Sequence, residues 1–208
     1  MTKADSELHV PVGGDFTNIF DAKTLLSMLN SQDESTVVLK FHLIMEEFIN
    51  IWCAKTTAVD DLFAGIDFVP FKTKLAIAHN LGLPDAGRKA LDKINTIRNR
   101  YSHRLKFEAS AGDIESLMTL IDNAFPETNV NKCSQSVISS EGSDAMGRRA
   151  TQRHEWSSGA SKQFFLMCVT LTMKLTIWIQ NEFKTRGIAY TLSTGLPQDL
   201  ARPMTVPS

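Results

Sequence analysis

The sequence predicts a single all-α domain, an antiparallel bundle of about five helices. Apolar residues recur three or four positions apart in several segments, which is the spacing of one helix face. No two segments combine the alternating apolar pattern of strands with the turn residues of a hairpin. The length of 208 residues suits one domain with appendages, and a hydrophobic content of 43% is enough for a buried core.

A short helix and five further helices are expected in chain order. They are residues 21–30, 36–55, 70–80, 89–107, 113–125 and 161–185. Asp21 is placed to cap the first, and the polar segment 31–35 caps the second. The second has one clear apolar stripe: Val37, Phe41, Ile44, Phe48 and Trp52. Pro70 suits the first turn of the third helix, and Gly82 is placed to end it.

The later helices are bounded by turn residues. Residues 84–87, Pro-Asp-Ala-Gly, predict a turn before the helix at 89–107. Gly112 and Pro126 bound the helix at 113–125. The last helix is apolar on two sides, which is typical of a central helix or of a dimer interface.

Composition divides the chain into five parts. They are a flexible lead-in at 1–20, a helical core at 21–126, a flexible polar linker or flap at 127–157, a long helix at 158–186 that completes the bundle or a dimer interface, and a mobile tail at 187–208. Residues 127–155 are rich in Ser, Asn, Gly and charge, so we expect a long connection that is disordered or covers an active site.

Charge and hydropathy exclude several classes of protein. The 22 basic and 23 acidic residues give a net charge of −1, so RNA binding would need a local patch. Residues 1–12 carry acids and lack the apolar core of a secretory signal. The longest apolar run, Phe164–Met173, is too short to span a bilayer, which predicts a soluble protein with no membrane association.

The metal-binding residue types show no convincing site. Cys53, Cys133 and Cys168 lack the spacing of a zinc site, and we expect reduced thiols in a cytoplasmic protein. His42 and Glu46 lie one helical turn apart, but no third ligand is evident. We therefore expect no metal and no cofactor.

A basic stretch at residues 86–107 is the first candidate site. Seven of its side chains are basic and one, Asp92, is acidic, which gives a local charge of +6. The basic residues are Arg88, Lys89, Lys93, Arg98, Arg100, Arg104 and Lys106. Such a helix could neutralise several phosphates, or it could be a solvated face paired with acids from elsewhere in the chain.

His103 gives this stretch a group for acid–base chemistry. An imidazole takes up and returns a proton near neutral pH, and a guanidinium can stabilise charge on a phosphate. Asn99 lies one turn before His103 on the same face. Arg98 lies five residues before it, which is about 140° of helical rotation. The two can act on one phosphate only if the arginine curls back, the helix bends, or two copies of the chain share a site.

The order Arg98, Asn99, three residues and His103 resembles the signature of the HEPN superfamily. That signature is an Arg, a polar residue directly after it, and a His that follows four to six intervening residues. Residues 71–76, 81–83 and 91–97 are similar to the segments that surround the motif in that superfamily.

The upstream part of the chain is similar to the mannitol-repressor (MltR-like) branch of the same superfamily. The similar features are Leu25–Leu29, the polar segment 31–35, and the helix that carries Glu46 and Glu47. The resemblance covers roughly residues 22–125 and implies a HEPN-like helical bundle.

The resemblance implies a metal-independent endoribonuclease that cuts single-stranded RNA by attack of the ribose 2′-hydroxyl. His103 would act as general base or acid, Arg98 would stabilise the phosphate, and Asn99 would help to orient it. Glu46 would complete the site, with Glu47 as the alternative, unless the glutamate is a surface acid that pairs with the basic helix.

Further residues are expected to contact the RNA. They are Lys93, Arg100, Tyr101, Arg104 and Arg149. Arg149 belongs to a second basic cluster in the polar linker, which could clamp RNA phosphates, bind a partner or remain solvated. Some HEPN toxins carry a tyrosine two residues after the histidine as a target for silencing. Leu105 stands there in this chain, so that route is not expected.

The resemblance also implies partners and a role. We expect RNA, a second copy of the chain, and an antitoxin or regulatory protein as partners, and a role as a toxin or antiviral defence effector. Two other functions stay open at this point. One is a non-catalytic MltR-like transcriptional regulator or protein-interaction module, and the other is a sensor or scaffold that binds a nucleotide in the same cleft.

Overall fold

Helices make up most of the described chain, so the prediction of a mostly helical, all-α protein is confirmed. The computed structural model describes residues 12–104, 106–143 and 149–194. The α-helices are α1 (Ala22–Asn30), α2 (Glu34–Thr57), α3 (Phe71–Asn80), α4 (Asp85–His103), α5 (Ala111–Asn123) and α6 (Ala160–Arg186). Short 3₁₀ helices follow at η1 (Pro126–Thr128), η2 (Cys133–Gln135) and η3 (Trp156–Ser158).

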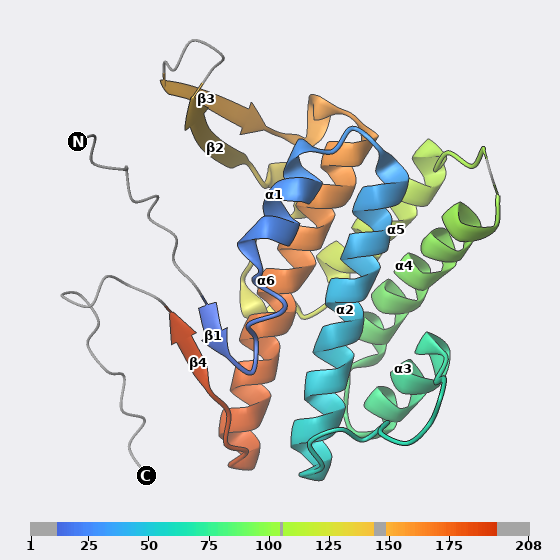
Figure 1. The fold of residues 1–208 in the computed structure, drawn as a ribbon, viewed down its shortest axis with the longest axis vertical. Helices are drawn as coiled ribbons and strands as arrows, with labels where there is room; N and C mark the ends of the chain where they lie inside the picture. The colour runs from blue at the N-terminus through green and yellow to red at the C-terminus, as the bar shows by residue number, and fades with distance from the viewer. Residues whose placement is uncertain (1–11, 105, 144–148, 195–208) are drawn as a thin grey trace, which may run out of the picture.

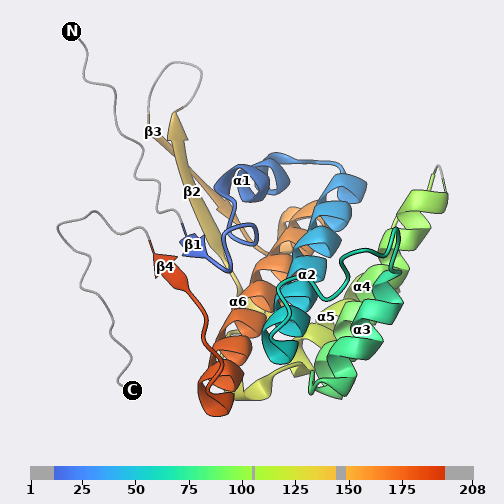
Figure 2. The ribbon, with the colours of Figure 1, turned by 60° about the horizontal axis from the view of Figure 1, so that its bottom comes forward.

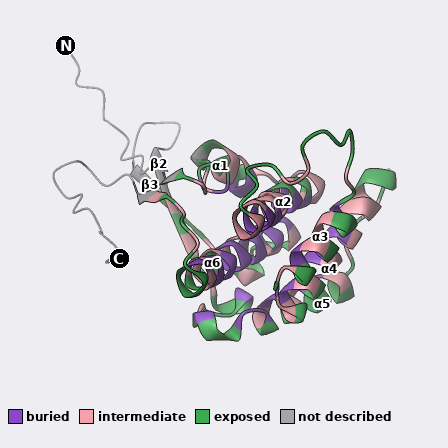
Figure 3. Ribbon diagram, turned by 90° about the horizontal axis from the view of Figure 1, so that it is seen from below, coloured by how far each residue is buried: buried purple, intermediate pink, exposed green. Residues whose placement is uncertain are grey.

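The bundle is built around α2 and α6, which lie side by side at its centre (Figure 1). α4 packs between α2 and α5, and α5 returns to α6. α3 bridges α2 and α4 (Figure 2), and α1 packs against α2 and α6. Buried residues gather along α2 and α6 (Figure 3). The two apolar sides of the last helix therefore belong to a central helix.

Aromatic side chains join the helices at one end of the core. The Trp52 ring of α2 lies 4.6 Å from that of Trp178 and stacks on Phe183 at 5.8 Å, both from α6. Phe125, just after α5, lies 5.2 Å from Trp178. The Trp52 indole nitrogen donates a hydrogen bond to the Ala78 carbonyl at 3.1 Å, which ties α3 to this cluster.

Two buried lysines of α6 cap the ends of other helices. Lys162 donates to the carbonyls of Leu29 and Ser31 at the end of α1. Lys174 donates to three carbonyls at the end of α5: Ile121 (2.9 Å), Asp122 (2.8 Å) and Ala124 (2.8 Å). A cation at a helix C-terminus complements the helix dipole and satisfies carbonyls that have no intrahelical partner. Burial lowers the pKa of both lysines below its usual value.

α4 begins and ends four residues earlier than predicted. The predicted turn at 84–87 forms its start, with Pro84 as N-cap. Gly87 is buried there against the ring of Phe125. A Cβ atom at this position would lie only 2.4 Å from Cζ of Phe125. At the other end Arg104 is extended. The chain leaves the helix so that the Phe107 ring packs edge-on against Tyr101 at 4.8 Å. His103 is therefore the last residue of α4.

Two small antiparallel sheets were not predicted. β1 (Val12–Gly14) pairs with β4 (Leu192–Thr194), and β2 (Ile138–Ser143) pairs with β3 (Arg149–His154). The prediction that no strand pair forms is therefore wrong.

The β2–β3 pair lies within the predicted polar linker and projects from the bundle (Figure 1). None of the strand residues whose burial is described, 138–140 and 151–154, is buried. Among these seven residues there is thus no buried apolar face that alternation could have marked. The expected flexible lead-in and mobile tail fall in part on residues 1–11 and 195–208, which lie outside the described residues.

Candidate functional site

His103 lies in an open groove between the end of α4 and the start of α2. The groove has a volume of about 790 Å³, and the side chain of His103 is exposed to solvent in it. Arg104 and Lys106 line the groove as well. Its acidic lining residues are Asp33, Glu34 and Glu108. Three acids against two cations leave one negative charge in excess in the groove lining, although the local charge of the sequence stretch is +6.

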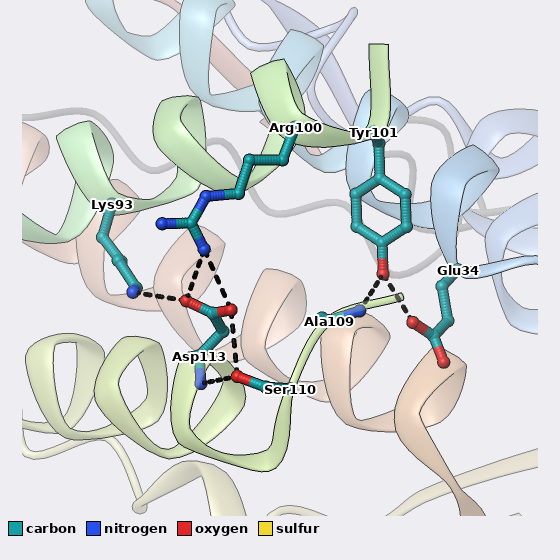
Figure 4. A network of polar contacts seen from close by, with 7 residues as sticks. All are labelled: Glu34, Lys93, Arg100, Tyr101, Ala109, Ser110 and Asp113. Atoms are coloured by element: carbon teal, nitrogen blue, oxygen red, sulfur yellow. Dashed lines mark hydrogen bonds and ion pairs between the residues drawn. The ribbon is translucent and has the colours of Figure 1, made fainter. Parts of the chain in front are cut away.

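Tyr101, which lines the same groove as His103, joins three segments of the chain (Figure 4). Its hydroxyl donates a hydrogen bond to Glu34 Oε2 at the start of α2 and accepts one from the Ala109 backbone at 3.2 Å. Burial and the Glu34 carboxylate raise the pKa of Tyr101 above its usual value. The hydroxyl of this expected RNA contact is thus occupied in holding the groove together.

Lys93 and Arg100, also expected to contact RNA, converge on Asp113 of α5 (Figure 4). The distances to its carboxylate are 2.9 Å from Lys93 Nζ and 3.0 Å from Arg100 Nη1. Ser110, the N-cap of α5, donates to the same carboxylate at 3.0 Å and accepts from the Asp113 backbone at 3.1 Å. Asp113 is only 12% exposed, and the hydrogen bond from Lys93 lowers its pKa. These two cations fasten α4 to α5.

Other cations of the basic stretch are paired too. Arg88 and Lys89 contact the Asp85 carboxylate at 2.7 Å and 2.9 Å and lower its pKa to about 2. Four of the seven basic residues therefore have an acidic partner within the chain. Arg104 and Lys106 are exposed and have no ion-pair partner within the described part of the chain.

Arg98 and Asn99 contact one another but do not line the His103 groove. Arg98 Nη1 donates to Asn99 Oδ1 at 3.0 Å. Arg98 Nε is buried without a hydrogen-bond partner among the described residues. Within one chain, the arginine and the histidine of the motif thus lie on different faces of α4, as the rotation of about 140° predicts.

Glu46 lies away from the histidine groove as well. It is twelve residues after Glu34 on α2, which is about 18 Å along the helix. Its carboxylate pairs with Lys74 of α3 at 2.9 Å. Glu46 is thus paired with a lysine of α3 rather than with the basic helix α4. The alternative, Glu47, accepts a hydrogen bond from Asn18 at 2.9 Å.

A buried histidine lies between Glu46 and Arg98. His42 is 4% exposed, and its Nδ1 is 4.0 Å from Glu46 Oε2. Its ring packs 4.5 Å from that of Phe71. Burial, aided by the Arg98 charge, lowers the pKa of His42, so this imidazole is held neutral. Within the described ranges, no group of three His, Cys, Asp or Glu residues could hold a metal ion.

The cysteines are buried and free. Burial raises the pKa of the Cys53 thiol to about 11, that of Cys168 to about 12, and that of Cys133 further still. Because the thiolate is the nucleophile, none of these residues suits covalent catalysis. Arg149 belongs to β3, and its side chain lies outside the described residues.

Three residues of this region were not anticipated from the sequence. Ser110 and Asp113 have the spacing of a capping box, which would have placed the start of α5 and a carboxylate beside α4. Glu34 follows the N-cap Asp33, and nothing local in the sequence pairs it with Tyr101 on a different helix.

Comparison with protein-family models, with curated proteins and with solved structures gives no match to this chain. The fold and the groove therefore define the protein only as a mostly helical chain with an exposed histidine at the end of a basic helix. Among the described helices, only α6 is long and apolar enough to cross a membrane. Of its most apolar window, 67% is buried in the bundle, as in the core helix of a soluble protein.

Proposed function

We propose that the chain is a cytoplasmic endoribonuclease of HEPN type, with a HEPN-like bundle, that cuts single-stranded RNA without a metal ion. One observation carries this proposal. The imidazole of His103 is exposed in an open groove, beside the exposed cations Arg104 and Lys106. An imidazole, the side chain that most often serves as general acid or base, then lies next to charges that attract phosphate.

The chemistry needs few protein groups, because RNA supplies its own nucleophile. His103 removes the proton of a ribose 2′-hydroxyl, and that oxygen attacks the adjacent phosphorus. The 5′-oxygen of the next nucleotide leaves and takes up a proton. A guanidinium stabilises the additional negative charge in the transition state. The products are a 2′,3′-cyclic phosphate and a 5′-hydroxyl.

The guanidinium comes from a second copy of the chain in this proposal. Arg98 and Asn99 do not line the groove of their own His103. Two chains that meet through the ends of their α4 helices would bring the Arg98 of each to the His103 of the other. The active protein is thus a homodimer with a shared cleft.

The first experiment is cleavage of a labelled RNA pool in EDTA, with end-group analysis. We expect wild-type protein to leave cyclic phosphate ends and His103→Ala to leave the RNA intact. Ser116→Ala, a change at an exposed serine of α5 outside the groove, should cut like wild type. Full activity of folded His103→Ala would refute the site.

Mixing two inactive variants tests the shared cleft. A heterodimer of Arg98→Ala with His103→Ala holds one cleft with both functional residues and one with neither. The mixture should therefore recover activity that neither variant has alone. A mixture that forms heterodimers and stays inactive would show that both residues act within one chain.

A role as a toxin or defence effector follows from the same chemistry. Expression of the wild-type chain should slow cell growth, and expression of His103→Ala should not. An antitoxin or regulatory protein would then be required to hold the activity in check.

A non-catalytic regulator similar to the mannitol repressor is the second candidate function. The pairing of four basic residues within the chain favours it, because these cations are less available to phosphate. A well-folded dimer that cuts no RNA, with or without His103, would favour this function.

A further inference from the structure

A second, larger groove lies at the other end of α2. It has a volume of about 1080 Å³ and runs between the last part of α2, the connection at residues 58–70, and residues 187–189 after α6. We call it the loop groove. From Glu34 beside His103 to Ala54 in the loop groove is twenty residues of helix, or about 30 Å. The two grooves are therefore separate sites.

Large apolar side chains of the connection are exposed along the loop groove. Phe68 is 79% exposed and Ile66 is 59% exposed, and both line the groove. Two large exposed apolar side chains in the lining of one groove give it an apolar surface that another molecule could cover.

The connection that carries these residues is held in shape. Asp61 Oδ1 accepts a hydrogen bond from the Phe63 backbone at 3.0 Å, and the Asp61 carbonyl accepts one from Ala64 at 3.2 Å. The Phe63 ring packs against the core and lies 5.0 Å below the ammonium of Lys74. Phe68 and Ile66 are thus presented by a folded connection that is anchored on the bundle.

The loop groove is strongly acidic. Six carboxylates line it against two lysines, which leaves four negative charges in excess on a chain whose total charge is −1. The lysines are already engaged, Lys55 with Asp15 and Lys74 with Glu46, each at 2.9 Å. The remaining acids have no cationic partner among the described residues: Glu47, Asp60, Asp61 and Asp67.

The exposed apolar side chains and the unpaired carboxylates together restrict the kind of molecule that can bind in the loop groove. RNA and the surface of an anionic membrane are repelled by four uncompensated carboxylates. Within the described residues, the acids do not form a group that could hold a metal ion. A peptide segment that alternates cations with large apolar side chains matches both features, because its cations meet the acids while its apolar side chains cover Phe68 and Ile66.

We propose that the loop groove is the docking surface for a basic, amphipathic peptide segment of a partner protein. The site is independent of His103 and goes beyond the proposed nuclease activity. Binding has an electrostatic part and an apolar part, so it weakens as salt is raised but is not abolished by salt.

The test uses the full chain and a fluorescein-labelled 16-residue peptide with Lys and Leu at helical spacing. Binding is followed by fluorescence anisotropy, and a peptide with Glu in place of Lys is the comparison. We expect the Lys peptide alone to bind. Phe68→Ser should weaken that binding by about tenfold or more, as for a central apolar contact. Phe68 is exposed, so this variant folds.

Charge is tested by replacing Asp60, Asp61 and Asp67 with Asn, which keeps the size of each side chain and an oxygen for the Phe63 hydrogen bond. The triple variant should lose most of the affinity and most of the salt dependence. Two matched controls should bind like wild type. They are Leu43→Ser, at an exposed leucine outside the loop groove, and Glu115→Gln, at an exposed acid on α5.

Three outcomes would overturn the proposal. The first is equal binding of the Lys and Glu peptides. The second is binding that survives both Phe68→Ser and the triple Asn variant. The third is self-association of peptide-free protein in light scattering that Phe68→Ser abolishes, which would assign the loop groove to a second copy of the chain.

Discussion

Replacing Lys174 by Met should destabilise the protein, although it places an apolar side chain in an apolar core. Lys174 donates to the carbonyls of Ile121, Asp122 and Ala124. The Ile121 carbonyl also accepts from the Ala124 backbone at 3.1 Å, so it keeps a partner in the variant. The carbonyls of Asp122 and Ala124 lose the hydrogen bond that Lys174 donates to them.

The expected loss in the free energy of unfolding can be worked out from these two carbonyls. A buried polar group without a partner costs about 1–3 kcal/mol, which gives about 2–6 kcal/mol for the pair. Methionine removes the unfavourable burial of the ammonium, which the lowered pKa of Lys174 reflects. We therefore expect a net loss of about 2–4 kcal/mol in the free energy of unfolding. For a chain of this size, that lowers the Tm by about 4–16 °C.

Urea and thermal denaturation followed by circular dichroism at 222 nm would measure this loss. Lys184→Met is the matched control, because Lys184 is an exposed lysine on the same helix. It should change the free energy of unfolding by less than about 0.5 kcal/mol. If Lys174→Met were as stable as wild type, the three hydrogen bonds would do no more than offset the burial of the ammonium, and the account of α6 as a stabilising cap would be refuted.

Three further predictions concern pH and packing. The pKa of His42 in the folded chain is held below its ordinary value of 6.5, so the unfolded chain binds a proton on His42 more readily than the folded chain does. The free energy of unfolding in urea should therefore fall as pH drops through 6.5 and lower, and His42→Gln should flatten this dependence. Asp113→Asn should lower the Tm at pH 7 by several degrees, equivalent to about 1–2 kcal/mol. Its effect should shrink as pH falls below 3.8, because the unfolded wild-type chain then binds a proton on Asp113 that the folded chain takes up only at lower pH. A difference that stays constant would contradict the ion-pair account. Gly87→Ala should lose about 1–3 kcal/mol in urea denaturation because its Cβ meets Phe125, and an unchanged midpoint would contradict that contact.

The helices could be predicted because their signals are local. Asp21 and Asp33 cap the helices that follow them, and apolar residues recur along each helix at a spacing that the sequence displays. The start of α4 could not be predicted in the same way. Gly87 indicates a turn by local rules, and only the ring of Phe125, far along the chain, accounts for a buried glycine inside the helix.

The candidate site was predicted in part for a similar reason. The position of His103 near the end of a basic helix follows from the sequence. The acids that neutralise much of that helix belong to other helices, as Asp113 does, and no local pattern pairs them with Lys93 or Arg100. Lys174 directly follows the apolar run Phe164–Met173, and nothing local in the sequence indicates its role, because the carbonyls it caps are about fifty residues away.

The dependence of α1 and α5 on α6 has a consequence for protein synthesis. Residues up to α5 leave the ribosome before α6 does, so the apolar stripe of α2 and the carbonyls at the ends of α1 and α5 lack their partners. About 60 more residues must be added before α6 is complete, which takes roughly 3–12 s at 5–20 residues per second. During that interval the nascent chain exposes apolar surface that general chaperones bind, and its yield in cells should depend on them.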